Sequence, residues 1–211
     1  MSLFVSLEGP DGSGKSTQAH RLARALRDRG YRVTETREPG GTRLSEGVRS
    51  LLFDPEAPPA TPMAMALLIA ASRAQLVHDV IKPALERGEI VIADRYADST
   101  LAYQAYGQGL ALRDMRELVR LATDGLLPDM TIYVDVPSSV GLARLAGRAE
   151  GNRLDTAELA FHERVRDGYL RLMESEAGRW RRVDGDAPED AVHCAILQSV
   201  EPALARVSQA V

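Results

Sequence analysis

Short runs of β-branched, aromatic and other apolar residues alternate along the chain with segments whose apolar residues recur every three or four positions. The runs have the length of buried strands. Because strands that alternate with helices form a parallel sheet covered on both faces, the pattern predicts an α/β fold with a five-stranded parallel sheet flanked by helices on both faces. The predicted strands are 3–7, 31–36, 90–93, 131–136 and 180–184.

Helical periodicity fills most of the segments between the predicted strands. It is clearest after the first strand, where Ala19, Leu22 and Leu26 share one face of a helix. Pro83 lies within a long apolar pattern and predicts a kink or a restart there. The polar and aromatic segment 99–106 is assigned no element. The other predicted helices are 44–52, 63–76, 77–88, 113–123, 138–145, 158–176 and a C-terminal helix that opens at 186–189.

Composition narrows the class of protein. The 211 residues are enough for one domain with a sizeable core. The formal net charge of −4 argues against a general nucleic-acid binder, so we expect no nucleic-acid partner. The four histidines are scattered without metal-ligand spacing. The single cysteine, Cys194, excludes an internal disulfide, and we expect it to be buried on an apolar helix face.

The chain shows no targeting or membrane-spanning pattern in its sequence. Its N-terminus lacks the charged and apolar regions of a secretory signal. The longest apolar run, 63–71, is too short to span a bilayer. We therefore expect a cytoplasmic protein with no membrane partner.

One motif dominates the chemistry. The segment 9–16 fits G-x-x-x-x-G-K-[ST], and it joins the first predicted strand to the first predicted helix, as a phosphate-binding loop (P-loop) must. Its glycines let backbone N–H groups wrap around phosphates at a helix N-terminus. The lysine reaches the β- and γ-phosphates, and the serine offers a hydroxyl to Mg²⁺. The predicted ATP-binding residues are Gly9, Pro10, Asp11, Gly12, Ser13, Gly14, Lys15, Ser16 and Thr17.

Lysine usage supports a special role for the loop's lysine. The chain has only two lysines, Lys15 and Lys82, among its 26 basic residues. A chain that otherwise uses arginine has placed a compact, flexible ammonium in this loop. We therefore expect Lys15 to be catalytic. Charged residues also follow the third predicted strand, at the sheet edge where α/β proteins bind ligands.

Three further stretches narrow the prediction: 37–41 (R-E-P-G-G), 73–75 (R-A-Q) and 94–96 (D-R-Y). With the P-loop, in this order and spacing, the chain resembles the thymidylate kinase family from Leu3 to the C-terminal helix. The resemblance implies a P-loop nucleoside monophosphate kinase fold in a single domain, 1–211. It implies phosphorylation of dTMP to dTDP with ATP and Mg²⁺, and a homodimer.

The resemblance also implies roles for individual residues. Asp11 matches the acid that hydrogen-bonds the substrate's 3′-hydroxyl, and Arg95 matches the arginine that holds the dTMP phosphate. Asp94 matches the carboxylate near Mg²⁺, together with Ser16. The other implied substrate contacts are Arg37 near the phosphates, Arg73 at thymine O4, Ser99 and Gln104 at the base, and Tyr103 near ribose C2′.

The sequence departs from the family pattern at two positions. Some members carry an arginine directly after the P-loop acid, where this chain has Gly12. The second position is Ile69, since the family usually has a phenylalanine there that stacks on thymine. Isoleucine cannot stack as an aromatic ring does, so the base clamp is expected to be weaker.

Members without an arginine in the P-loop have a basic lid instead, and the segment 144–154 supplies one. We expect Arg144 and Arg153 to bind ATP. We expect Arg148, which lies between two glycines, to act as a catalytic arginine that neutralises charge on the transferred phosphoryl group.

Two alternatives remain open from the sequence. One is another P-loop kinase, acting on a different nucleotide or small molecule. The other, less favoured, is a GTPase-type switch, which needs an N-K-x-D motif. The only asparagine, Asn152, lies in a segment that does not match it.

Overall fold

The computed structural model describes residues 1–54, 56–146, 159–205 and 207. Five strands form one sheet in the order β2-β3-β1-β4-β5, and every neighbouring pair is parallel. Each of the five strands predicted from the sequence is present, and its ends lie within two residues of the expected bounds. The strands are β1 (Leu3–Glu8), β2 (Val33–Arg37), β3 (Ile90–Asp94), β4 (Met130–Asp135) and β5 (Trp180–Asp184).

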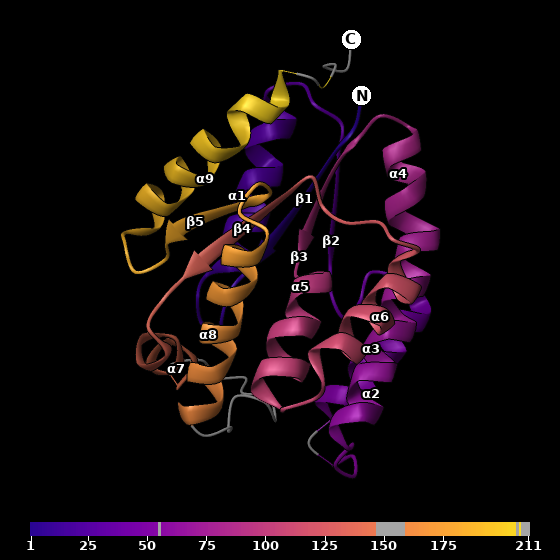
Figure 1. Cartoon of the computed structure of the whole chain (residues 1–211). Coiled ribbons are helices and arrows are strands. Elements are labelled where there is room, and N and C mark those ends of the chain that lie inside the picture. The colour runs from indigo at the N-terminus through magenta and orange to yellow at the C-terminus, as the bar shows by residue number, and fades with distance from the viewer. Residues whose placement is uncertain (55, 147–158, 206, 208–211) are drawn as a thin grey trace.

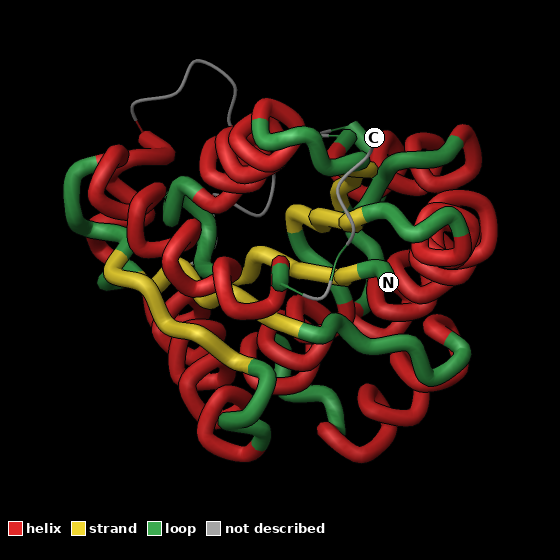
Figure 2. Tube along the Cα trace, turned by 90° about the horizontal axis from the view of Figure 1, so that it is seen from above, coloured by secondary structure: helices red, strands yellow, loops and turns green. Residues whose placement is uncertain are grey.

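Helices cover both faces of the sheet (Figures 1 and 2). The α-helices are α1 (Lys15–Asp28), α2 (Arg43–Phe53), α3 (Pro62–Leu76), α4 (Lys82–Glu86), α5 (Ala97–Thr100), α6 (Leu112–Thr123), α7 (Ser138–Ala146), α8 (Leu159–Ser175) and α9 (Glu189–Leu204). There are also two π-helical stretches: η1 (Val77–Ile81) lies between α3 and α4, and η2 (Leu101–Gly107) directly follows α5. The predicted fold class is therefore confirmed.

Alternation along β1 divides the core into two layers. Leu3, Val5 and Leu7 pack against α1 and α9, whereas Phe4 packs on the opposite face among residues of η1, α5, η2 and α8. Successive side chains of a strand point to opposite faces, so a buried central strand is apolar on both. Glu8 at the end of β1 is on the same face as Phe4 and is fully buried.

The helix that begins at Pro62 continues without a break through η1 and α4 to Glu86. Its 25 residues are long and apolar enough, by length and composition, to cross a membrane. This corrects the expectation, based on 63–71 alone, that no segment is long enough to span a bilayer. In the fold it packs against α2 and α6, and it buries Arg73 in an ion pair, so we assign it as a core helix. Pro83 lies in the first turn of α4, directly after the π-helical turn, where the helix returns to α-helical hydrogen bonding.

Two sequence-based expectations fail, because in both segments the direction of the side chains differs from the one that the pattern suggests. The segment 99–106, which was assigned no element, is helical. Its polar side chains face inward, which hides the helical pattern: Thr100 and Gln104 are buried, and Ser99 is partly buried. Cys194 is exposed rather than buried. Val192 and Ile196 take the core-facing positions of α9, and residue 194 between them points outward.

Candidate active site

The P-loop lies between the end of β1 and the start of α1. Gly14 is the N-cap of α1 in a left-handed conformation, φ 87°. Gly12 also has a positive φ of 76°, and a Cβ there would lie 2.1 Å from the carbonyl oxygen of Gly141 on α7. Only glycine fits such a close approach of two backbones. An arginine at position 12 would displace α7, so this chain cannot take the P-loop arginine of other family branches without a backbone shift.

Lys15 is buried at the floor of the loop. Its ammonium donates to the carbonyl oxygen of Pro10 at 3.2 Å and lies 3.8 Å from an Asp11 carboxylate oxygen. Burial, and then the nearby Arg95 cation, lowers the pKa of Lys15 to about 8. Added negative charge in front of the loop would favour the ammonium form, as a phosphate group would.

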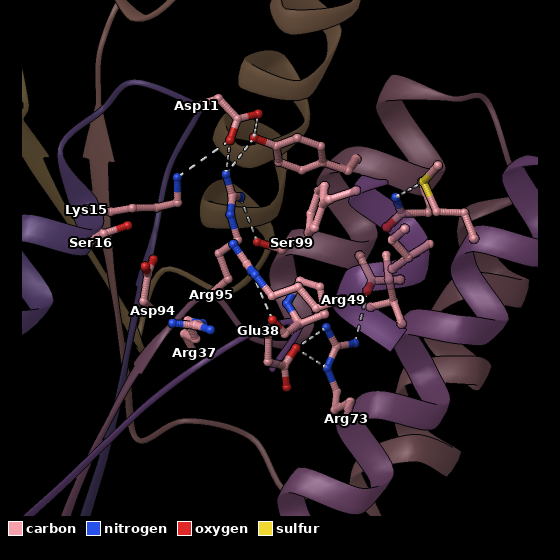
Figure 3. A pocket seen from close by; sticks show the side chains of 18 of the residues that line it. Asp11, Lys15, Ser16, Arg37, Glu38, Arg49, Arg73, Asp94, Arg95 and Ser99 are labelled. Carbon is pink, nitrogen blue, oxygen red and sulfur yellow. Dashed lines mark hydrogen bonds and ion pairs between the residues drawn. The ribbon is translucent and has the colours of Figure 1, made fainter. Parts of the chain in front are cut away.

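Arg95 follows β3 and reaches across to the P-loop (Figure 3). Its Nη2 donates to Asp11 Oδ1 and, at 2.9 Å, to the hydroxyl of Tyr103. Its Nη1 donates to Ser99 Oγ at 3.1 Å and to the hydroxyl of Tyr169 at 3.3 Å. The guanidinium also lies 4.7 Å from the centre of the Tyr103 ring. Hydrogen bonds from both terminal nitrogens therefore hold the planar guanidinium in place without a ligand.

Asp11 lies opposite this fork and accepts from two partners. Tyr103 donates to its Oδ2 at 2.8 Å, while Arg95 binds Oδ1. Burial alone would raise the pKa of Asp11, but the Arg95 and Lys15 cations outweigh it and hold that pKa below its usual range. A carboxylate that stays ionised keeps lone pairs for a further donor, such as a substrate hydroxyl.

Arg73 is buried at the other side of the cavity. Its Nε and Nη2 both donate to Glu38 Oε2, at 2.8 and 2.6 Å; Nη2 also donates to the carbonyl oxygen of Tyr96, and Nη1 to Thr100 Oγ1 at 3.0 Å. These bonds use four of the five N–H donors of a guanidinium and leave one on Nη1. The Glu38 partner keeps the charge compensated in a fully buried place.

All these side chains line one cavity of about 400 Å³. Its walls come from the P-loop, α2, α3, the turn after β3, η2 and Leu145 of α7. Ile69 and Met65 give α3 an apolar wall, and Phe53 of α2 adds an aromatic ring. Gln104 Nε2 lies 3.9 Å from the sulfur of Met65, a weak acceptor, so its amide keeps hydrogen-bonding capacity for a ligand.

Two more arginines enter the same cavity. Arg37 donates to both carboxylate oxygens of Glu46, at 3.1 and 3.0 Å, and is half exposed. Arg49 of α2 donates to the carbonyl oxygen of Pro39 at 3.0 Å and lies over the Phe53 ring. Burial, and then the Arg37 cation, lowers the pKa of Arg49. Basic side chains therefore outnumber the carboxylates of Asp11, Glu38 and Asp94 in the cavity lining (Figure 3).

Comparison with known proteins decides the family. The model of the family described as thymidylate kinase matches residues 7–196. The chain belongs to the thymidylate kinase family. It is 48% identical to the thymidylate kinase of Deinococcus radiodurans, over 94% of this chain and 96% of that protein. It is 50% identical to that of Thermomicrobium roseum, over 98% of each chain.

A solved structure supports the same assignment. The crystal structure of thymidylate kinase from Ehrlichia chaffeensis superposes with a TM-score of 0.76 at 34% identity, covering 94% of this chain and 98% of that one. The chain thus has the fold of a thymidylate kinase, with the P-loop and the arginine-lined cavity at the carboxyl edge of its sheet.

The two residues expected to hold Mg²⁺ carry donor atoms that this ion accepts. Ser16 is exposed at the start of α1 and lines the cavity, as does Asp94. Asp94 Oδ1 is buried and has no hydrogen-bond partner among the described residues. Hydroxyl and carboxylate oxygens are donors that Mg²⁺ accepts, with water and phosphate oxygens completing its shell. No cluster of three or more His, Cys, Asp or Glu that could hold a metal occurs within the described ranges.

The lid prediction falls only partly within the described residues. Arg144 on α7 donates to the carbonyl oxygen of Gly185 at 3.0 Å and to Asp186 at 3.1 Å, so it lies against the loop that follows β5. Arg148 and Arg153 lie outside the described residues.

The sequence analysis missed Arg49, Glu38 and Glu8. Nothing in the local sequence separates Arg49 from the chain's other arginines, and its position in the cavity depends on how α2 packs on α3. Ser99 lines the cavity, and its hydroxyl bonds Glu8 Oε2 at 2.6 Å and Arg95; its expected contact with the base stays a prediction. The polar residue at the end of an otherwise apolar strand was the available signal for Glu8.

Proposed function

We propose that the protein phosphorylates dTMP to dTDP with ATP and Mg²⁺. The observation that carries this proposal is that the P-loop lysine and three arginines, Arg37, Arg49 and Arg95, line one cavity whose far wall holds Arg73 and Gln104. Such a cavity has room for two phosphates facing each other and a base beyond them. Family membership supports dTMP as the acceptor.

The donor triphosphate lies on the P-loop. The N–H groups at the start of α1 and the Lys15 ammonium bind its β- and γ-phosphates. Ser16 and Asp94 hold Mg²⁺, which neutralises phosphate charge when bound. Arg144, with the loop after β5, contributes to ATP binding from the side, and Arg153 joins it from the lid.

The acceptor nucleotide lies across the cavity. Its phosphate is bound by Arg95, with Arg37 and Arg49 adding charge, because guanidinium groups match phosphate geometry. Asp11 accepts from the 3′-hydroxyl, and Tyr103 covers C2′ of the sugar. The base lies between Ile69 and the α2 side of the cavity, where the remaining N–H of Arg73 and the amide of Gln104 provide its polar contacts.

Transfer then depends on position and charge. The two phosphates are brought together, and the developing charge on the equatorial oxygens is balanced by Lys15, Arg95 and Arg148 of the lid. A side chain at position 12 would collide with Gly141, which disfavours an arginine there. We therefore propose the lid segment 144–154 as the source of the additional cation.

We also propose that the chain acts as one kinase domain in the cytoplasm and as a homodimer. Four exposed apolar side chains lie on α2 and α3, namely Leu44, Leu51, Met63 and Leu67. Exposed apolar side chains on two helices that contact each other favour association of copies. Light scattering on the purified protein measures the oligomeric state.

The function is tested by incubating the protein with ATP, Mg²⁺ and dTMP and separating the products. We expect equal amounts of dTDP and ADP. ADP without dTDP would indicate a nucleotide hydrolase, and turnover of a different monophosphate in place of dTMP would contradict the proposed acceptor.

A further inference from the structure

Glu8 is a buried carboxylate that the proposed reaction does not use. It is the last residue of β1, and none of its surface is exposed. It lies directly before the P-loop but points to the opposite face of the sheet from α1, under the turn that follows β3. A buried carboxylate is costly unless all its oxygens are hydrogen-bonded, so its partners indicate what it holds in place.

The two oxygens of Glu8 accept three hydrogen bonds. Oε1 accepts from the backbone N–H of Tyr96 at 2.8 Å. Oε2 accepts from Ser99 Oγ at 2.6 Å and from the hydroxyl of Tyr169 at 2.8 Å. These partners come from the turn after β3, from α5 and from α8, so one side chain joins three elements.

The same two hydroxyls accept hydrogen bonds from one nitrogen of Arg95. Its Nη1 donates to Ser99 Oγ and to Tyr169 Oη, at 3.1 and 3.3 Å. A hydroxyl has one proton and two lone pairs. The two hydroxyl oxygens also lie 2.9 Å apart, so either hydroxyl could donate to the other in place of Glu8. When the ionised Glu8 accepts both protons, lone pairs of both oxygens remain for the two N–H groups of Nη1. Glu8 therefore sets the direction of the hydrogen bonds that orient Arg95.

Glu8 also acts on the backbone of Arg95. This residue has a φ of 70°, a left-handed conformation that is uncommon for a non-glycine residue and must be held by its surroundings. The end of β1 holds it on both sides: Arg95 N donates to the carbonyl oxygen of Leu7 at 3.0 Å, and Tyr96 N donates to Glu8.

We propose that Glu8 is a positioning residue for Arg95, and that through Ser99, Tyr169 and the Tyr96 N–H it sets the affinity of the site for the phosphate of the acceptor nucleotide. The inference rests on the proposed role of Arg95 as the phosphate ligand. It predicts that Glu8 affects the binding of a nucleoside monophosphate but not of the nucleoside that lacks the phosphate.

An amide cannot replace the carboxylate. Glutamine has the same shape, but one of its two polar atoms is an N–H₂ donor. Placed toward Tyr96 N, that donor faces another donor. Placed toward Ser99 and Tyr169, it forces those hydroxyls to turn their protons away. The amide N–H groups then compete with Arg95 for the lone pairs of the two hydroxyl oxygens. Glu8→Gln thus changes the direction of hydrogen bonds without creating a cavity.

The experiment measures the dissociation constants of dTMP and thymidine by calorimetry at pH 8, without ATP. The variants are Glu8→Gln, Arg95→Ala and, as a matched control, Asp135→Asn. Asp135 is a buried carboxylate at the end of the neighbouring strand β4, bonded to Tyr133, Arg166 and Arg182 and to none of the Arg95 network.

We expect Glu8→Gln to raise the Kd of dTMP about tenfold, as a lost charge-assisted hydrogen bond does, and to leave that of thymidine within about twofold. Arg95→Ala should show the same selectivity with a larger effect, and Asp135→Asn should leave the ratio of the two constants unchanged. Tyr169→Phe removes one hydroxyl, and we expect a smaller change of the same sign; this variant tests the inference if Glu8→Gln does not fold.

Two results would overturn the inference. If Arg95→Ala weakens dTMP selectively while Glu8→Gln and Tyr169→Phe do not, Glu8 has no positioning role and the proposed function stands. If Arg95→Ala leaves the ratio unchanged, the phosphate role of Arg95 is itself wrong and the inference fails with it.

Discussion

The two sides of the cavity are built in different ways. On the donor side, the P-loop is a contiguous stretch that positions backbone N–H groups and one lysine. On the acceptor side, Arg95 and Arg73 are held by side chains and carbonyl groups from distant parts of the chain, including Asp11, Glu38 and Tyr169. Local sequence is therefore enough to build a phosphate-binding loop, whereas the acceptor side depends on the packing of several elements.

The largest effect is expected on the donor side. Lys15→Ala removes the one ammonium in the loop, and because phosphoryl transfer depends on neutralising charge, we expect kcat to fall by on the order of 10³. The other lysine gives a matched control. Lys82 bonds Asp124 at the surface, so Lys82→Ala should keep normal turnover. A folded Lys15→Ala variant with near-normal kcat would contradict the assigned role.

On the acceptor side the shape of the cation matters as well as its charge. Arg95→Lys keeps the charge but cannot bond Asp11, Tyr103, Ser99 and Tyr169 with one planar group, so we expect KM for dTMP to rise about tenfold. Arg113→Lys on the surface of α6 is the control. If KM for dTMP is the same in both variants, the fork geometry of Arg95 has no function.

We expect a smaller effect on substrate preference from changes at Tyr103, where the ring and the hydroxyl have different roles. Its ring is expected to exclude a ribose 2′-hydroxyl, and its own hydroxyl bonds Asp11 and Arg95. Tyr103→Ala should therefore reduce the preference for dTMP over ribothymidine monophosphate, whereas Tyr103→Phe keeps the ring and should retain that preference. Equal loss of activity on both substrates in Tyr103→Ala would show that the ring only packs.

The smallest effect is on stability as a function of pH. Burial, and then the Asp98 carboxylate, raises the pKa of Glu8 from its ordinary value near 4.5 to about 7; Arg95, Ser99 and Tyr169 also face it. The folded state therefore binds a proton that the unfolded state has lost, so this contribution to stability is present at low pH and is lost as pH rises through about 7.

The free energy of unfolding, measured with urea at pH 5 and 7.5, tests this sign. We expect the wild type to lose more stability over this interval than Glu8→Gln, which has no titrating group there. An equal change in both proteins would show that Glu8 titrates at the same pH in the folded and unfolded chains.

The sequence predicted the features that depend on a contiguous stretch and missed those that depend on the packing of distant elements. The five strands and the P-loop depend on contiguous patterns, and both were found. Glu8 was not, since its partners Ser99 and Tyr169 are 91 and 161 positions away. Arg49 was missed because only the packing of α2 brings it to the cavity. The helical character of 97–107 was hidden because its polar side chains face inward rather than toward solvent.

The most direct test of the account is the choice of acceptor. With saturating ATP and Mg²⁺, kcat/KM is measured separately for dTMP, dUMP, dCMP and AMP on the wild-type protein. The account predicts that dTMP exceeds dCMP and AMP by at least about tenfold, because a buried polar contact to the base costs that much when it is mismatched. Equal efficiency with dCMP or AMP would contradict the claim that this cavity recognises a thymine nucleotide.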